Sequence, residues 1–137
     1  MALRRVGFYR EIHPDSTLPW LRERSGTRRT RSEAEIVAYL RSGHMISAVM
    51  EGSRDVFDDT PFPEGSGCSS FLTDGAWVWR NDLSHYVEKY HVQMPDEFVR
   101  HLVESGFRVP DMSPERLAEL VEVEKRELGP DWWTTPW

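Results

Sequence analysis

The feature that most restricts the fold is a strand–turn–strand pattern near the middle of the chain. Segments 69–73 and 76–79 flank Asp74-Gly75. This dipeptide is typical of a two-residue type I′ hairpin turn, because both central residues of that turn need a positive φ. We therefore predict a β-hairpin with its turn at Asp74-Gly75.

The second strand of this hairpin is aromatic. Trp77 and Trp79 alternate with Val78, and side chains two residues apart on a strand project from the same face. A sheet face this apolar has to be buried against another element. We expect helices to cover both indoles.

Helix signals occur in four segments. A capping-box pattern runs from Ser32 to Glu35, and Gly43 is predicted to end that helix in a left-handed conformation. The other three starts are Asn81 or Asp82, Pro95, and Ser113-Pro114. The apolar residues predicted to face inward are Leu83, Tyr86, Val87, Tyr90, Phe98, Val99, Leu102, Val103, Leu117, Leu120, Val121 and Leu128.

Three further strands are predicted, at Val6–Ile12, at His44–Met50 and, as a short one, at Arg54–Phe57. The order of elements indicates an α+β fold, with a small antiparallel sheet of about three to five strands packed by about four helices. The length of 137 residues suits a single domain, 1–137. Composition predicts an Arg-rich loop at 22–31, a loop at 58–68, and a Trp-rich tail at 130–137.

The overall composition is that of a soluble globular protein. Hydrophobic residues make up 39% and charged residues 29% of the chain. No apolar run approaches the roughly 20 residues of a membrane span, and no signal-peptide pattern is present. The single cysteine, Cys68, excludes an intrachain disulfide and favours a reducing compartment, so we expect a cytoplasmic protein.

No established catalytic, cofactor-binding or metal-binding pattern is found. Cys68 lies beside no group that would activate it. The histidines lack the four-residue spacing of a helical zinc site. We expect His85 at a helix surface or boundary, and His101 in surface pairs with Glu97 and Glu104. The prediction is therefore of no catalytic residues, no cofactor and no metal.

Charge is unevenly distributed along the chain. The net charge is −6, yet residues 1–33 are basic overall and residues 34–137 carry the acidic excess. An acidic body disfavours nucleic acid and anionic membranes, and favours a basic partner. The candidate acidic residues are Asp55, Asp58, Asp59 and Glu64 in the loop and Asp74 at the hairpin, with Glu115, Glu119 and Glu122 as a second face. A plain solvated loop explains the same pattern.

The tail contains Trp132, Trp133 and Trp137 in a segment without periodicity. These side chains either fold back on the core or form a docking segment, because exposed tryptophans are favoured at interface hot spots. Trp132 and Trp133 are included among the candidate partner-binding residues.

The hairpin and the helices after it resemble a motif of small actinobacterial proteins, some of them similar to immunity proteins of polymorphic toxin systems. The matching residues run from Leu72-Thr73-Asp74-Gly75 through Trp77, Trp79, Asp82-Leu83, Tyr86-Val87, Tyr90 and Val92 to Pro95 and Glu97-Phe98, with Tyr39–Gly43 upstream. The resemblance covers about residues 36–105. It implies no catalytic residues, and almost every matching position also has a folding role.

The leading hypothesis is a non-catalytic, acidic, immunity-like binding protein that blocks a basic toxin domain, nuclease-type or other. A second hypothesis is a small enzyme whose site is assembled from distant residues such as His44, Glu51, Asp55 and His85. A third is a regulatory module that binds a small ligand in an apolar pocket.

Overall fold

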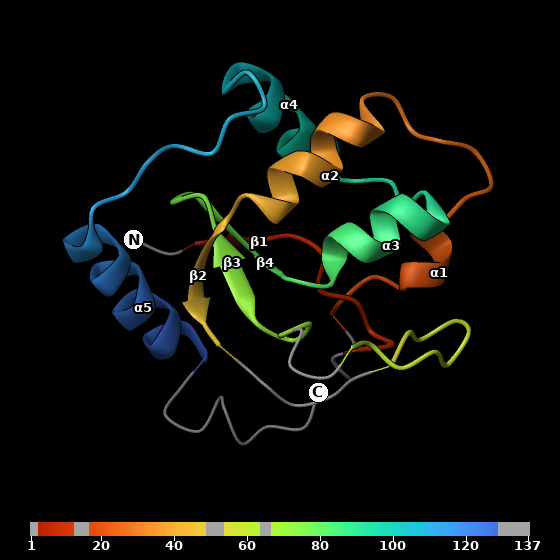
Figure 1. Cartoon of the computed structure of the whole chain (residues 1–137), viewed down its shortest axis with the longest axis horizontal. Coiled ribbons are helices and arrows are strands. Elements are labelled where there is room, and N and C mark those ends of the chain that lie inside the picture. Colours follow the sequence, from red (N-terminus) through yellow and green to blue (C-terminus); the bar gives the residue numbers. More distant parts are fainter. Residues whose placement is uncertain (1–2, 13–16, 49–53, 64–66, 129–137) are drawn as a thin grey trace.

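The protein is built on a four-stranded mixed sheet with the strand order β1-β4-β3-β2 (Figure 1). The computed structural model describes residues 3–12, 17–48, 54–63 and 67–128. Its strands are β1 (Arg4–Arg5), β2 (His44–Ser47), β3 (Phe71–Thr73) and β4 (Trp77–Arg80). β1 is parallel to β4, whereas β2, β3 and β4 pair antiparallel.

The β3–β4 hairpin is confirmed, but its turn is not type I′. Thr73 pairs with Val78 and Leu72 with Trp79. Within the turn Gly75 has a positive φ of 99°, and Asp74 does not. The Asp74 carboxylate instead accepts hydrogen bonds from the amides of the next turn residues, Ala76 (2.9 Å) and Trp77 (2.8 Å). This side-chain closure is an Asx turn, which replaces the predicted backbone geometry.

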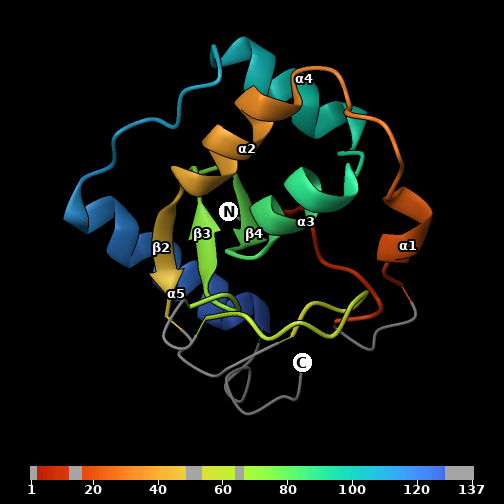
Figure 2. The ribbon, with the colours of Figure 1, turned by 45° about the vertical axis from the view of Figure 1, so that its right-hand side comes forward.

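Helices cover both faces of the sheet (Figures 1 and 2). They are α1 (Leu21–Arg24), α2 (Glu33–Arg41), α3 (Leu83–Tyr90), α4 (Asp96–Glu104) and α5 (Pro114–Leu128). α2, α3 and α4 pack over the face that carries Trp77 and Trp79, and α5 packs against the opposite face. The predicted α+β class is confirmed.

Two hydrophobic cores follow from the alternation along β4. Trp77 and Trp79, both buried, belong to a large core that also includes Tyr39 of α2 and Phe98 of α4. Val78 points the other way, into a smaller core closed by α5. The other members of that smaller core are Leu3, Phe8, Ile46, Phe71 and Leu120. The prediction that helices bury both indoles is confirmed.

Two predicted strands are wrong. Residues 6–12 form no strand, because Gly7 turns the chain at a φ of 77° and any side chain there would meet Leu83. Only Arg4–Arg5, just before them, pair with β4. Arg54–Phe57 is likewise irregular, with a single bridge from Arg54 to Pro61.

The ends of α2 also differ from prediction. Ser32 has a φ of 59° and its side chain makes no capping hydrogen bond, so the capping box is not formed. Gly43 is not left-handed. Glycine is needed at position 43 because there is no room for a side chain: a Cβ there would lie 2.7 Å from the Trp79 ring and 2.9 Å from the Cβ of Leu72. At α5, by contrast, the Ser113 hydroxyl caps the Arg116 amide at 3.1 Å, as predicted.

The loop predicted at 58–68 is found in the described part of that range. The loop predicted at 22–31 begins only after Arg24, because residues 22–24 belong to α1. Within the described residues, no helix combines the length and apolarity required to cross a lipid bilayer. The 130–137 tail, with Trp132 and Trp133, lies outside the described residues.

Candidate functional site

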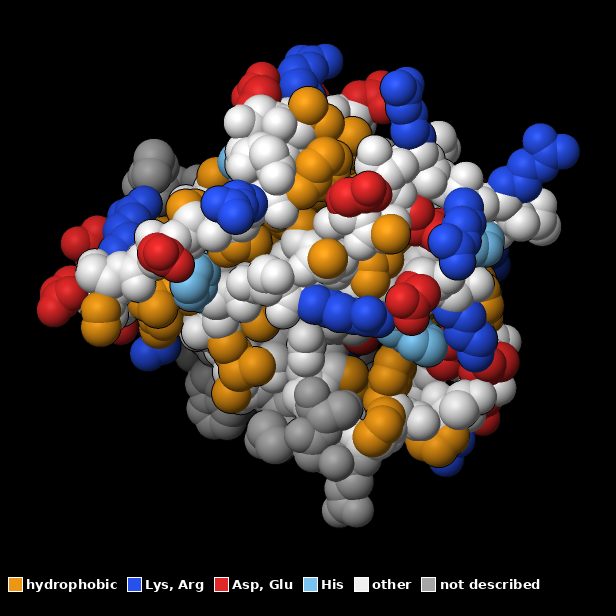
Figure 3. All heavy atoms as spheres, turned by 45° about the horizontal axis from the view of Figure 1, so that its top comes forward, with side chains coloured by type: hydrophobic (Ala, Val, Ile, Leu, Met, Phe, Trp, Pro, Cys, Tyr) orange, Lys and Arg blue, Asp and Glu red, His pale blue; other side chains and the backbone are white. Residues whose placement is uncertain are grey.

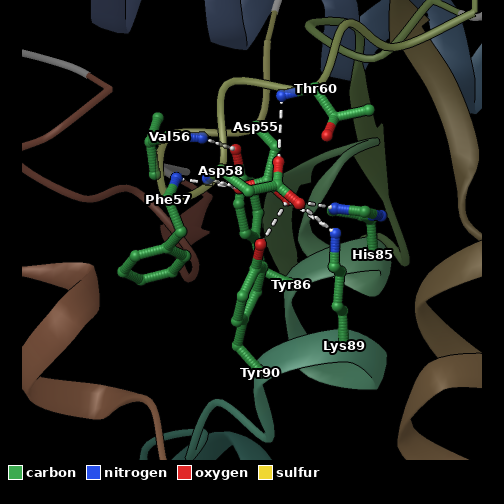
Figure 4. A network of polar contacts seen from close by, with 9 residues as sticks. All are labelled: Asp55, Val56, Phe57, Asp58, Thr60, His85, Tyr86, Lys89 and Tyr90. Atoms are coloured by element: carbon green, nitrogen blue, oxygen red, sulfur yellow. Dashed lines mark hydrogen bonds and ion pairs between the residues drawn. The ribbon is translucent and has the colours of Figure 1, made fainter.

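The segment 54–61, called the 54–61 loop below, is folded around one buried carboxylate (Figure 4). The Asp55 side chain is 2% exposed. It accepts four hydrogen bonds, from the Phe57 amide (2.8 Å), the Asp58 amide (3.3 Å), His85 Nε2 (2.7 Å) and the Tyr90 hydroxyl (2.9 Å). Two donors come from the loop itself and two from α3, so this carboxylate joins the loop to the helix.

Backbone hydrogen bonds close the loop. The Asp55 amide donates to the Thr60 carbonyl at 2.9 Å, and the Asp59 amide donates to the Asp55 carbonyl at 2.9 Å. The Val56 amide donates to the hydroxyl of Tyr86 on α3 at 3.2 Å. The conformation of the 54–61 loop is therefore held both by hydrogen bonds within its own backbone and by hydrogen bonds to α3, although the loop contains no helix or strand.

The electrostatics of the cluster keep Asp55 ionised. Burial by itself raises the pKa of this carboxyl, but the hydrogen bonds from His85, the Phe57 amide and Tyr90 outweigh burial and hold the pKa below its usual range. Burial raises the pKa of Tyr86, and burial together with the bond to Asp55 raises that of Tyr90, so both phenols remain donors at neutral pH.

A second ion pair flanks the cluster. Lys89 of α3 donates to the Asp58 carboxylate and lies 3.8 Å from that of Asp55. The hydrogen bond from Lys89 and the one from the Thr60 amide lower the pKa of Asp58. Asp59 lies 3.6 Å from Arg54, with its side chain 82% exposed.

The 54–61 loop presents apolar side chains to solvent. Val56 and Phe57 are each 38% exposed and are among the few large hydrophobic residues that are exposed in the described part of the chain. The Phe57 ring rests on Tyr90, with 4.4 Å between ring centroids. The apolar Val56 and Phe57 therefore neighbour the acidic Asp58 and Asp59 on a loop that is held by hydrogen bonds to α3.

The pairing of a buried carboxylate with a partly exposed histidine recurs twice elsewhere. Asp74 accepts from His101 Nε2 (2.8 Å) and the Tyr39 hydroxyl (2.5 Å). Glu33 accepts from His91 Nδ1 at 2.8 Å. Since the motif occurs at three separate places, it is first of all a structural device by which this fold ties loops to helices.

The acidic residues singled out from the sequence therefore divide into two groups. Asp55 and Asp74 are buried and fully hydrogen-bonded, so the expectation that they provide surface charge is wrong. Asp58 and Asp59 are exposed. Glu64 lies outside the described residues, as do Trp132 and Trp133. Figure 3 shows acidic and basic side chains interspersed over the face it presents, not a continuous acidic surface.

The histidines also differ from prediction. His101 bonds Asp74, not Glu97 or Glu104, because the hairpin turn lies against α4. His85 is partly exposed as expected, but its ring is fixed by Asp55. Of the proposed enzyme set, Asp55 and His85 do meet, Glu51 lies outside the described residues, and His44 bonds the Pro110 carbonyl.

No group of three His, Cys, Asp or Glu side chains within the described residues is placed to hold a metal ion. Cys68 is buried at 4% exposure. Three residues of α3 contact the 54–61 loop: Tyr86, Lys89 and Tyr90. The sequence predicts Tyr86 and Tyr90 only as part of an apolar helix face, and it gives no indication of a role for Lys89. Their i, i+3, i+4 spacing on α3 places them on one side of the helix, but nothing in the sequence indicates that the loop docks there.

Comparisons of the chain with known protein families, with curated proteins and with solved structures found no match.

Proposed function

We propose that this chain is a non-catalytic binding protein that recognises a basic protein surface through the 54–61 loop. The observation that carries the proposal is the exposure of Val56 and Phe57 on a loop whose central carboxylate takes four hydrogen bonds. Contiguous exposed apolar patches mark interaction sites, and Val56 and Phe57 are adjacent in this loop.

Preorganisation supports the same function. Binding normally costs the free energy of ordering the loops and side chains at an interface, and a loop already fixed in the free protein avoids most of that cost. Phe57 is an aromatic side chain supported by Tyr90 underneath, as anchors at interface hot spots usually are. Asp55 acts through the backbone of the loop and is a positioning residue.

Charge provides the selectivity. Asp58 and Asp59 border the apolar pair, and the chain as a whole carries a net charge of −6. A basic partner can replace Lys89 and Arg54 as the cation beside these two carboxylates, and the negative net charge attracts a basic partner and repels an acidic one. In keeping with the resemblance to immunity proteins, the proposed partner is a toxin domain with a basic cleft, which the bound chain blocks without chemistry.

Affinity capture with matched variants tests the proposal. Wild-type protein, Phe57→Ala and Met45→Ala serve as baits for candidate toxin domains, beginning with the product of the neighbouring gene. Met45 is 50% exposed and lies on β2, so it controls for the loss of an exposed apolar side chain. The proposal predicts a partner held by wild type and Met45→Ala and released by Phe57→Ala. Equal retention by all three baits contradicts it.

Charge reversal gives a second, independent readout. Asp58→Lys with Asp59→Lys should slow association and remove most of its salt dependence, because exposed charges steer encounter. Glu97→Lys with Glu104→Lys, on α4, is the control with the same change in net charge. If both double variants weaken association equally, only the net charge matters and the 54–61 loop is not the contact.

A second candidate function, acid–base catalysis, is favoured by one observation. The Asp55 carboxylate fixes the His85 ring through Nε2, while within the described residues no hydrogen bond is found for Nδ1. This pairing is how a carboxylate orients a catalytic imidazole. His85→Gln tests it: loss of a hydrolytic activity with partner binding retained would establish catalysis, and binding lost together with fold stability would show a structural role.

A further inference from the structure

A basic groove is formed largely by the chain segment that joins α1 to α2. This segment is drawn in orange at the right-hand edge of Figure 1. The groove has a volume of about 380 Å³. Its lining includes Arg24, Arg28, Arg29, Arg31, His91 and Gln93. Four exposed arginines therefore border one hollow in an otherwise acidic protein.

Within the described residues, most of these guanidinium groups form no ion pair. Arg29 lies 3.9 Å from the buried Glu33 carboxylate, which also accepts from His91. For Arg24, Arg28 and Arg31 no ion pair with any described carboxylate is found. Arginine presents several N–H donors in a fixed plane, which suits the oxygens of a phosphate. The groove consequently has an excess of positive charge and of donors.

A smaller, largely apolar pocket lies next to the groove. Arg24 and Gln93 line both, so the two hollows share a wall. The pocket measures about 140 Å³. Its other lining residues include Val6, Phe8, Tyr9, Leu18 and Pro19. A charged recess thus adjoins an apolar one of the size of a single ring system.

We propose that the groove and the adjoining pocket together bind a small molecule of the nucleotide class, which has a phosphate part and an aromatic or apolar part. The phosphates lie among Arg28, Arg29 and Arg31, and the apolar part enters the pocket beside Leu18. The size of the groove and the net charge of −6 favour a compact ligand over nucleic acid, because an acidic body repels an extended polyanion. This site is separate from the 54–61 loop.

Calorimetric titration with two probes, pyrophosphate and adenosine triphosphate, tests the assignment. Both should bind at one site, and the nucleotide more tightly. Arg28→Gln with Arg31→Gln should weaken both probes about tenfold or more, since two charge-assisted contacts are removed. Arg100→Gln with Arg108→Gln is the matched control, with the same charge change at two exposed arginines of the α4 region, and should change affinity less than about twofold.

Leu18→Ser separates the two halves of the groove. This substitution should lower the affinity for adenosine triphosphate to that for pyrophosphate, while the affinity for pyrophosphate stays unchanged. A circular-dichroism melt verifies that the variant is folded. The assignment fails if neither probe saturates at millimolar concentration, or if the control weakens binding as much as the groove variant. It also fails if a single-stranded oligonucleotide of about ten residues binds far more tightly than the nucleotide, because the ligand is then a nucleic acid.

Discussion

Replacing Asp55 by alanine should destabilise the protein far more than its place in an irregular loop suggests. The substitution removes the acceptor of four hydrogen bonds. Hydrogen bonds to a charged group contribute about 1.5–3 kcal/mol each when well formed. The Asp58 contact is long at 3.3 Å and His85 is one-third exposed, so water takes over part of the loss. We expect a decrease in the free energy of unfolding of about 2–4 kcal/mol.

Urea denaturation followed by circular dichroism measures this decrease. Asp59→Ala is the control, because Asp59 is a neighbouring acidic residue whose side chain is 82% exposed. Its ion pair with Arg54 should contribute no more than about 0.5 kcal/mol, and alanine at the positive φ of 59° should add about 0.5–1 kcal/mol of backbone strain. A cost below about 1 kcal/mol for Asp55→Ala, or a cost equal to that of Asp59→Ala, would refute the conclusion that this carboxylate organises the loop.

Three further predictions concern stability. Folding lowers the pKa of Asp55, so its contribution to the free energy of unfolding is complete above the unfolded-state pKa of about 4 and is lost as pH falls through the lower folded-state pKa. Urea midpoints measured between about pH 5 and pH 2 should therefore fall less steeply for Asp55→Asn than for wild type. Gly43→Ala should cost about 1–3 kcal/mol in the same assay, because its Cβ would overlap the Trp79 ring. Tyr39→Phe should cost about 1–2 kcal/mol by removing a donor to Asp74, and a thermal melt unchanged from wild type would contradict that contact.

The local architecture was largely readable from the sequence. The aromatic alternation of β4 and the apolar faces of α3 and α4 depend on neighbours in the chain, and the structure confirms them with one exception. Val103, predicted to face inward, is 57% exposed. At Gly7, Gly43 and His101 the predictions failed because a distant contact replaced a local one. Gly43 has the right residue type for a helix stop, but its size is required by Trp79, 36 positions later.

The candidate site was harder to predict for the same reason. Asp55 and Asp74 look like solvated acids in a loop and a turn, and both are buried by partners at least 27 positions away, His85 and His101 among them. Sequence spacing cannot reveal such pairs, because the donors lie on helices whose docking depends on the whole core. The sequence predicts Asp58 and Asp59 as exposed partner-binding residues, and the structure exposes both. It places Phe57, which lies between Asp55 and Asp58, in a strand and predicts no contact role for it.

The central claim, that the 54–61 loop is a preorganised recognition surface, is tested most directly by the dissociation constant of Phe57→Ala for the captured partner. Phe57 is 38% exposed but packs on Tyr86 and Tyr90, so its removal should cost about 1 kcal/mol of stability and leave the protein folded in the binding assay. The account predicts binding weaker by about tenfold or more for this variant, and by less than about twofold for Met45→Ala. An unchanged dissociation constant for Phe57→Ala would contradict the account.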